Sequence, residues 1–111
     1  MKFVQQGDVL FFGMEELPQT AKRKTINDRR GVVFAEGEVT GHYHACALDQ
    51  TIEIFENLDA QGEKEVWAVL TAPKEIEHQE HDNVTLEPGI WKIGIVREID
   101  PFSKEIREVA D

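Results

Sequence analysis

Short apolar runs separated by turn residues make up most of this chain, and they predict strands rather than helices. Apolar and polar side chains alternate over 51–55, as a half-buried strand requires, and a continuous apolar run lies between two glycines at 7–13. Pro88-Gly89 is a strong turn signal between two such runs. We expect strands at 7–13, 31–35, 39–48, 51–55, 65–71, 74–78, 84–87 and 90–96.

Two segments have a less regular pattern. Residues 14–30 contain Pro18 and many cations, and they predict a loop or a short helical turn, with a basic loop around 18–31. Residues 102–111 follow the break at Asp100-Pro101 and allow a short helix or a last strand. Several short strands with turns between them predict one mainly β domain over 1–111, built as a small antiparallel barrel or sandwich.

Composition agrees with a single folded domain. The chain has 111 residues and 41% of them are hydrophobic, which is enough for a core. No stretch is long and apolar enough for a membrane span, and the first residues lack the pattern of a signal peptide. The single cysteine, Cys46, excludes an internal disulfide. We therefore expect a cytoplasmic protein, because a lone thiol suits a reducing compartment.

The charge of the chain restricts its partners. A net charge of −10 repels phosphate backbones and anionic membranes, so we expect neither nucleic acid nor a membrane as partner. The same charge favours a protein partner with a basic surface. One segment differs, because five cations stand close together there beside a single acid, Asp28. They are Lys22, Arg23, Lys24, Arg29 and Arg30. This segment is either a solvated loop or a site for phosphate-bearing ligands such as a nucleotide.

All four histidines fall into two close pairs, which is the feature that points to a particular chemistry. His42 and His44 have H-x-H spacing, so on a strand their rings share one face, about 6.6 to 7 Å apart, and can converge on one ion. His78 and His81 have a spacing that suits a turn or a bulge, which leaves open whether both rings face the same way. Four imidazoles suit a divalent transition metal, with zinc first among the candidates.

Carboxylates near the pairs extend this prediction. Glu80 and Glu38 are candidates for a base that assists a metal-bound water. Cys46 is either a thiolate ligand or a small buried hydrophobe. The pattern names no reaction. An alternative without chemistry also fits the sequence: a non-enzymatic acidic interaction module, of phage or host-defence type, that forms a homodimer or binds a basic protein.

The H-x-H strand resembles the first motif of the cupins, whose metal site lies inside a small β-barrel. Gly37, His42, His44 and Asp49 stand where that motif has its glycine, two histidines and acid. The second cupin motif has a histidine after a Pro-x-Gly turn, and here no histidine follows Pro88-Gly89. The resemblance implies a metal site at the H-x-H strand and covers that neighbourhood alone.

A second resemblance covers nearly the whole chain. The sequence is similar to a family of small, uncharacterised bacterial and phage proteins, which implies one domain and no particular activity. The matching segments are Gln6-Gly7-Asp8-Val9-Leu10, Leu17-Pro18, 36–44, His78-Gln79-Glu80-His81, Leu86-Glu87-Pro88-Gly89, Arg97-Glu98 and 107–111.

Overall fold

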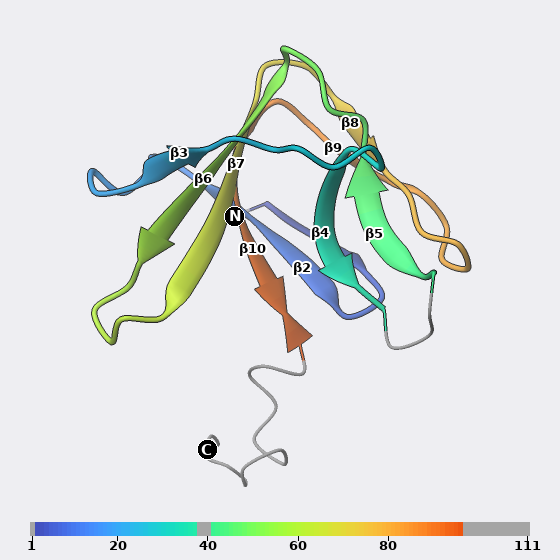
Figure 1. Ribbon diagram of the computed structural model, residues 1–111, viewed down its shortest axis with the longest axis horizontal. Coiled ribbons are helices and arrows are strands. Elements are labelled where there is room, and N and C mark those ends of the chain that lie inside the picture. The colour runs from blue at the N-terminus through green and yellow to red at the C-terminus, as the bar shows by residue number, and fades with distance from the viewer. Residues whose placement is uncertain (1, 38–40, 97–111) are drawn as a thin grey trace, which may run out of the picture.

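The computed structural model describes residues 2–37 and 41–96, which form an antiparallel β structure (Figure 1). Within these residues there is no helix of the length and apolar character that crossing a bilayer demands. The strands are β1 (Phe3–Gln6), β2 (Val9–Met14), β3 (Lys22–Lys24), β4 (Val32–Glu36), β5 (Tyr43–Cys46), β6 (Ile52–Leu58), β7 (Lys64–Leu70), β8 (Lys74–Ile76), β9 (Val84–Leu86) and β10 (Gly89–Ile95).

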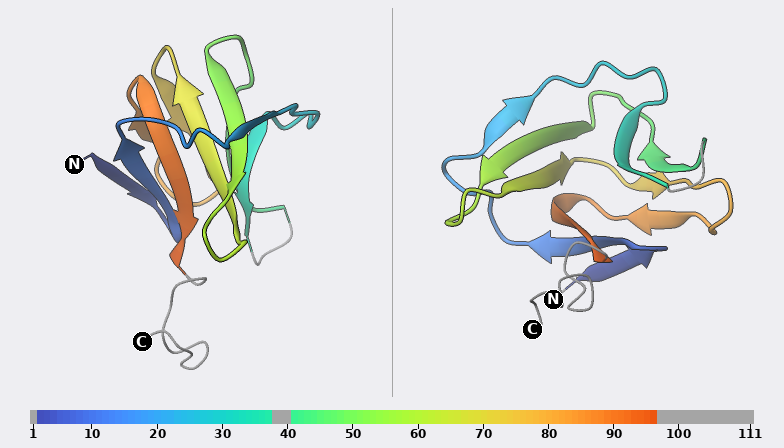
Figure 2. Two further views of the ribbon diagram at one scale, coloured as in Figure 1. Left: turned by 90° about the vertical axis from the view of Figure 1, so that its left-hand side faces the viewer. Right: turned by 60° about the horizontal axis from the view of Figure 1, so that its bottom comes forward.

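A six-stranded sheet is the main element, with the order β1-β2-β10-β7-β6-β3. Two small sheets, β4-β5 and β8-β9, stand opposite part of its inner face, and the large sheet curves around them (Figure 2). The small sheets are joined through Ala45 and Glu77, whose backbone groups exchange hydrogen bonds of 3.0 and 2.8 Å. This junction fixes β5 beside β8 and therefore positions the two histidine pairs.

The core fills the space between the large sheet and the two small ones. Ile93 of β10 pairs with Phe11 of β2 on one side and with Val66 of β7 on the other. These three side chains therefore lie side by side on the inner face. The small sheets contribute Ile76 and Leu86, which are completely buried. Because side chains alternate across a strand, the opposite residues of the large sheet point away from this core.

The prediction of a mainly β, antiparallel structure is confirmed, and the predicted barrel is not. The described strands do not close on themselves, so a cupin-like barrel is not observed. The strand predicted over 7–13 begins two residues later, because Gly7 has a φ of 59° and forms a turn with Asp8. That turn joins β2 to β1, a strand that the sequence analysis missed.

The predicted basic loop around 18–31 is also only partly a loop. Lys22–Lys24 forms β3, the outermost strand beside β6, with Lys22 opposite Glu56 and Lys24 opposite Ile54. All three of its side chains are exposed, so the segment shows no alternation of apolar and polar positions. Exposed lysines are typical of edge strands, where they discourage pairing with another chain. The helix or strand considered for 102–111 lies outside the described residues.

Candidate functional site

The two histidine pairs come together at the junction of the small sheets. His44 lies on β5 with His42 just before that strand, and His78 and His81 lie in the loop between β8 and β9. The bridge between Ala45 and Glu77 brings the residues next to it, His44 and His78, side by side. Ring centroids are separated by 4.4 Å for His44 and His78, 4.6 Å for His78 and His81, 5.5 Å for His42 and His78, and 6.0 Å for His44 and His81.

A third segment, the Gly7-Asp8 turn, packs against this cluster. A Cβ atom at Gly7 would lie 2.7 Å from His81 Nε2 and 3.2 Å from His44 Cε1, so the close approach of this turn requires glycine. The positive φ of Gly7 requires it too. Asp8 follows directly, and its Oδ1 lies 3.6 Å from His44 Nε2. The site is therefore assembled from three separate parts of the chain.

Gln6 fixes the protonation of His44. The Gln6 side chain is buried, and its Nε2 donates two hydrogen bonds of 2.9 Å, one to the carbonyl of Ile76 and one to that of Asp82. Both amide protons are thereby used, so the Gln6 Oε1 atom, 2.8 Å from His44 Nδ1, must accept from that nitrogen. His44 consequently carries its proton on Nδ1, and its Nε2 lone pair faces Asp8 and the other rings.

His78 has the opposite arrangement. Its Nδ1 accepts hydrogen bonds from the backbone N–H groups of Glu80, at 3.0 Å, and His81, at 3.2 Å. A neutral imidazole whose Nδ1 accepts must carry its proton on Nε2. The cluster therefore contains an acceptor, His44 Nε2, and a donor, His78 Nε2–H, on two rings whose centroids are 4.4 Å apart.

The surroundings favour neutral rings. Burial lowers the pKa of His44, and the neighbouring His78 lowers it further. Partial desolvation lowers the pKa of His78, and His81 and His42 act in the same direction. Both imidazoles are then uncharged at neutral pH, which leaves the His44 Nε2 lone pair available to bind a proton or a metal ion.

The predicted carboxylates are placed differently from one another. Glu80 Oε2 lies 3.8 Å from His42 Nε2, and 72% of the Glu80 side chain is exposed, so Glu80 stands at the rim of the cluster. Glu38 lies outside the described residues. Asp49, the acid suggested by the cupin motif, instead forms a 2.6 Å ion pair with Lys74, which lowers its pKa to about 2. Asp49 is therefore committed to a structural contact.

The possible thiolate ligand, Cys46, belongs to the core. Its side chain is buried in the main hydrophobic cluster, and this burial raises its pKa to about 11. A thiol of that pKa stays protonated at neutral pH, and the thiolate is the form that binds metals. Of the two interpretations of Cys46, the small buried hydrophobe fits the structure.

The sequence analysis missed Gln6, Gly7 and Asp8 as parts of the site. Gly7-Asp8 is a recognisable turn dipeptide, and apolar residues stand on both sides of it, at Phe3-Val4 and from Val9 onward. Interpreting this dipeptide as a hairpin turn would have predicted β1. Nothing local marks Gln6, because its three hydrogen-bond partners are 38 or more residues away.

The distances between the rings suit ligands of one metal ion, whereas the orientations of the rings do not. In the described part of the chain, no three His, Cys, Asp or Glu side chains are arranged to hold an ion as they stand. Two imidazoles on one tetrahedral zinc have centroids about 5 Å apart. The four measured separations, 4.4 to 6.0 Å, lie on both sides of that value.

Together, the fold and the cluster define a small antiparallel β domain with a histidine-lined site. Residues 5–96 match the family described as Domain of unknown function (DUF8820), and the chain belongs to that family. The match supports the predicted membership of a family of small uncharacterised domains. The chain matches no curated protein and no solved structure.

Replacing Gln6 by leucine tests the control of the His44 tautomer. The Gln6→Leu variant leaves the Ile76 and Asp82 carbonyls and His44 Nδ1 without their partner, and each buried group left unpaired costs about 1–3 kcal/mol. We expect a lower free energy of unfolding and a shift of His44 toward the Nε2–H form, measured by denaturation and by nitrogen NMR of the rings. Gln5→Leu is the control, since Gln5 is exposed and bonds only locally, to Gly7. An unchanged His44 tautomer in Gln6→Leu contradicts the assignment.

Stability should depend on pH in a defined direction. The unfolded chain binds protons at its histidines near the ordinary pKa of about 6.5, whereas His44 and His78 resist protonation in the fold. The free energy of unfolding of the metal-free protein should therefore fall as the pH drops from about 6.5 to 5. The stabilising carboxylates Asp28 and Asp49, with pKa values of about 2, act only below this window. Denaturation curves measured at several pH values in this window check the prediction. In the His44→Gln, His78→Gln double variant, the free energy of unfolding should depend less on pH.

Proposed function

We propose that this chain is a small metal-binding β domain whose ion, with zinc as the first candidate, is held at the histidine cluster. The observation that supports the proposal is the gathering of four imidazole rings from two segments far apart in sequence, with the ring centroids of the other three 4.4 to 5.5 Å from that of His78. The lowered pKa values of His44 and His78 support it, because only an unprotonated nitrogen binds a metal.

His44 is the ligand best prepared for this role. Its Nδ1–H donates to Gln6, and metal-binding histidines commonly donate their second nitrogen in this way, which fixes the ring and aims the other nitrogen. Asp8 Oδ1 lies 3.6 Å from His44 Nε2. Two ligands of a tetrahedral zinc are separated by about 3.4 Å, so the two atoms need little adjustment to share an ion. His81 is the third proposed ligand, with His42 as the alternative to it, so a tetrahedral ion keeps one open position.

His78 and the carboxylates have a different proposed role. Coordination through His78 Nε2 would require that nitrogen to lose its proton while Nδ1 still accepts two backbone hydrogen bonds. His78 is therefore better suited to donate a hydrogen bond to whatever occupies the open position of the metal. Bound zinc acidifies water, and Glu80 at the rim, or Glu38, would accept the proton. We assign no reaction beyond this.

Titration of the chelator-treated protein with Zn²⁺, followed by calorimetry or with a competing dye, tests the proposal. We expect one ion per chain and affinity at least about tenfold lower in Asp8→Asn and in His81→Ala. His81 is exposed, so its variant should fold. Asp82→Asn is the matched control for Asp8→Asn, because Asp82 is a neighbour whose backbone carbonyl, rather than its carboxylate, bonds Gln6. No stoichiometric ion in the parent, or equal losses in Asp8→Asn and Asp82→Asn, would overturn the proposal.

A second candidate function, an interaction module, is favoured by one edge of the large sheet. Phe3 on the edge strand β1 is 51% exposed, and its ring contacts that of Phe12 of β2 in a tilted arrangement with centroids 5.4 Å apart. Register puts both rings on the outer face of the sheet, away from the core. An exposed aromatic side chain on an edge strand, packed on a half-buried one, suits a two-fold symmetric contact with a second copy of the chain. The acidic body separately suits a basic protein partner.

Sedimentation measurements over a wide range of protein concentration test the homodimer. We expect the parent to dimerise with increasing concentration and Phe3→Ser to remain monomeric, because the variant loses the exposed aromatic contact. Leu48→Ser removes an exposed apolar side chain elsewhere and should behave like the parent. A parent that stays monomeric at every concentration removes this candidate and does not affect the metal proposal.

A further inference from the structure

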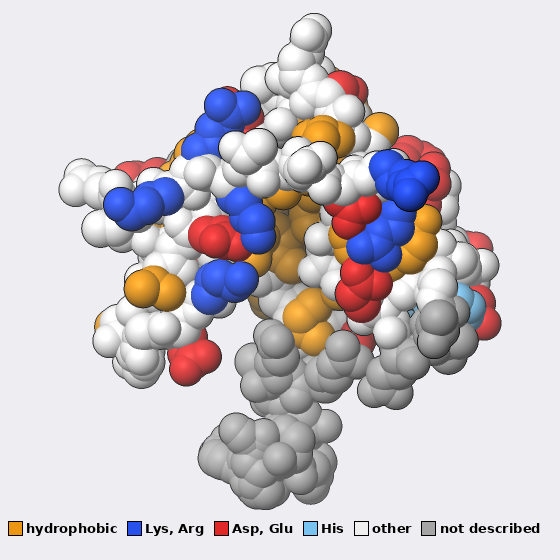
Figure 3. All heavy atoms as spheres, in the orientation of Figure 1, with side chains coloured by type: hydrophobic (Ala, Val, Ile, Leu, Met, Phe, Trp, Pro, Cys, Tyr) orange, Lys and Arg blue, Asp and Glu red, His pale blue; other side chains and the backbone are white. Residues whose placement is uncertain are grey.

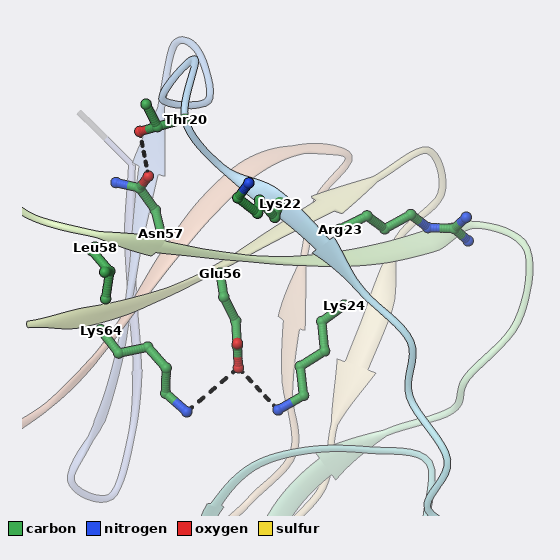
Figure 4. Close-up of a pocket in the computed structure, with 8 residues that line it drawn as sticks. All are labelled: Thr20, Lys22, Arg23, Lys24, Glu56, Asn57, Leu58 and Lys64. Carbon is green, nitrogen blue, oxygen red and sulfur yellow. Dashed lines mark hydrogen bonds and ion pairs between the residues drawn. The ribbon is translucent and has the colours of Figure 1, made fainter.

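A second site-like feature lies at the opposite edge of the large sheet. A cavity of about 590 Å³ opens there among β3, β6 and β7 (Figure 4). Most of the chain is acidic, yet cations predominate at this cavity. Its lining residues are Thr20, Lys22, Arg23, Lys24, Glu56, Asn57, Leu58 and Lys64. None of them belongs to the histidine cluster.

Strand register explains why lysines gather on this inner face. Lys22 pairs with Glu56, and Leu58 pairs with Lys64. These four side chains therefore lie on the same face of the sheet as Ile54, which belongs to the core. Lys24, opposite Ile54, joins them.

The neighbouring arginine is directed elsewhere. Arg23 pairs with Phe55, lies on the other face of β3 and approaches Glu53, with Nε 3.5 Å from Oε2. Figure 4 shows its side chain pointing away from the other lining residues. The cationic part of the cavity therefore consists of the three lysines.

Glu56 holds two of these lysines together. Its Oε2 accepts a hydrogen bond of 2.9 Å from Lys24 Nζ and lies 3.5 Å from Lys64 Nζ. The bond from Lys24 lowers the pKa of Glu56, which stays ionised at neutral pH. An ammonium group has three N–H donors, so each lysine keeps donors for a ligand after it has bonded Glu56. One carboxylate thus positions two cations and leaves the three lysines in excess.

The cavity also has an apolar wall. Leu58 is 66% exposed, more than the other exposed large hydrophobic residues of the described chain. The methylene stems of the lysines add apolar surface below their charged ends. Figure 3 shows Lys and Arg side chains beside a hollow in which hydrophobic side chains are visible. A ligand here would meet positive charge and apolar surface together.

We propose that this cavity binds a small organic anion with an apolar body, of the fatty-acid carboxylate class. The anionic head would lie beside Lys24 and Lys64, whose ammonium groups meet at Glu56, and the apolar body would cover Leu58. Figure 4 shows the Lys22 ammonium group apart from these two. An inorganic anion would use the cations alone and leave the leucine in water. Removing exposed apolar surface from water is favourable, so the apolar body adds to the affinity that exposed charges provide.

NMR titration of the full chain with decanoate, below the concentration at which it aggregates, tests this inference. We expect saturable shifts at Leu58 and the neighbouring backbone of β3 and β6. Decanol, which has the same chain length and no charge, should bind more weakly, and so should inorganic phosphate. Equal binding of decanol and decanoate would overturn the role of the lysines, and phosphate binding as tight as that of decanoate would overturn the role of the apolar wall.

Variants of the lining give changes of opposite sign. Lys24→Gln with Lys64→Gln should weaken decanoate binding about 3- to 10-fold, whereas Glu56→Gln should tighten it about 2- to 5-fold, because the internal anion no longer competes. Leu58→Ser should weaken decanoate and leave phosphate unchanged. Arg29→Gln, an exposed cation outside the lining, is the control for charge. Urea denaturation establishes that each variant is folded. Weaker decanoate binding in Glu56→Gln, or an equal loss in Arg29→Gln, contradicts the inference.

Discussion

The hydrogen bonds of one buried amide, that of Gln6, connect the three segments on which the histidine site depends. The amide links β1 to His44 on β5 and to the carbonyls of Ile76 and Asp82, at the two ends of the loop that carries the other histidine pair. A buried amide that loses its partners is costly, so the loop and the ring are held where these partners can be met. This requirement adds to the backbone bridge between Ala45 and Glu77 and to the bond from the Tyr43 N–H to Gln79 Oε1, and together they set the geometry of the site.

The same bonds determine what the rings can do. His44 and His78 are both histidines, and their ring centroids are 4.4 Å apart. Gln6 Oε1 accepts a hydrogen bond from His44 Nδ1–H and keeps the proton there, whereas two backbone N–H groups donate to His78 Nδ1 and leave its proton on Nε2. One ring therefore offers a lone pair and the other a proton. A cluster of four free histidines would have no such division. The distinction explains why His44 is the first proposed ligand, although all four histidines are equivalent in the sequence.

Local pattern was sufficient for most strands and for the candidate histidines, and insufficient for what connects them. The alternation at Ile52–Ile54 and the H-x-H spacing are properties of neighbouring residues, which a sequence displays directly. β3 was missed because Lys22–Lys24 is a strand only through its pairing with β6, and its exposed cations carry no apolar signal. Gln6 was missed for a similar reason, since its role arises from partners distant in sequence.

The two edge strands of the large sheet carry different kinds of side chain. The need to prevent an edge strand from pairing with another chain, here called edge protection, explains only part of this difference. Lysines on β3 discourage pairing with another chain, which by itself accounts for their presence there. It does not account for Lys64, which lies on β7 inside the sheet order, or for Leu58, an exposed apolar residue that edge protection would exclude. Glu56 joins Lys64 to Lys24 across β6, so the cations form one arrangement rather than a row along the edge. That arrangement is better explained by a ligand than by the need to blunt a strand.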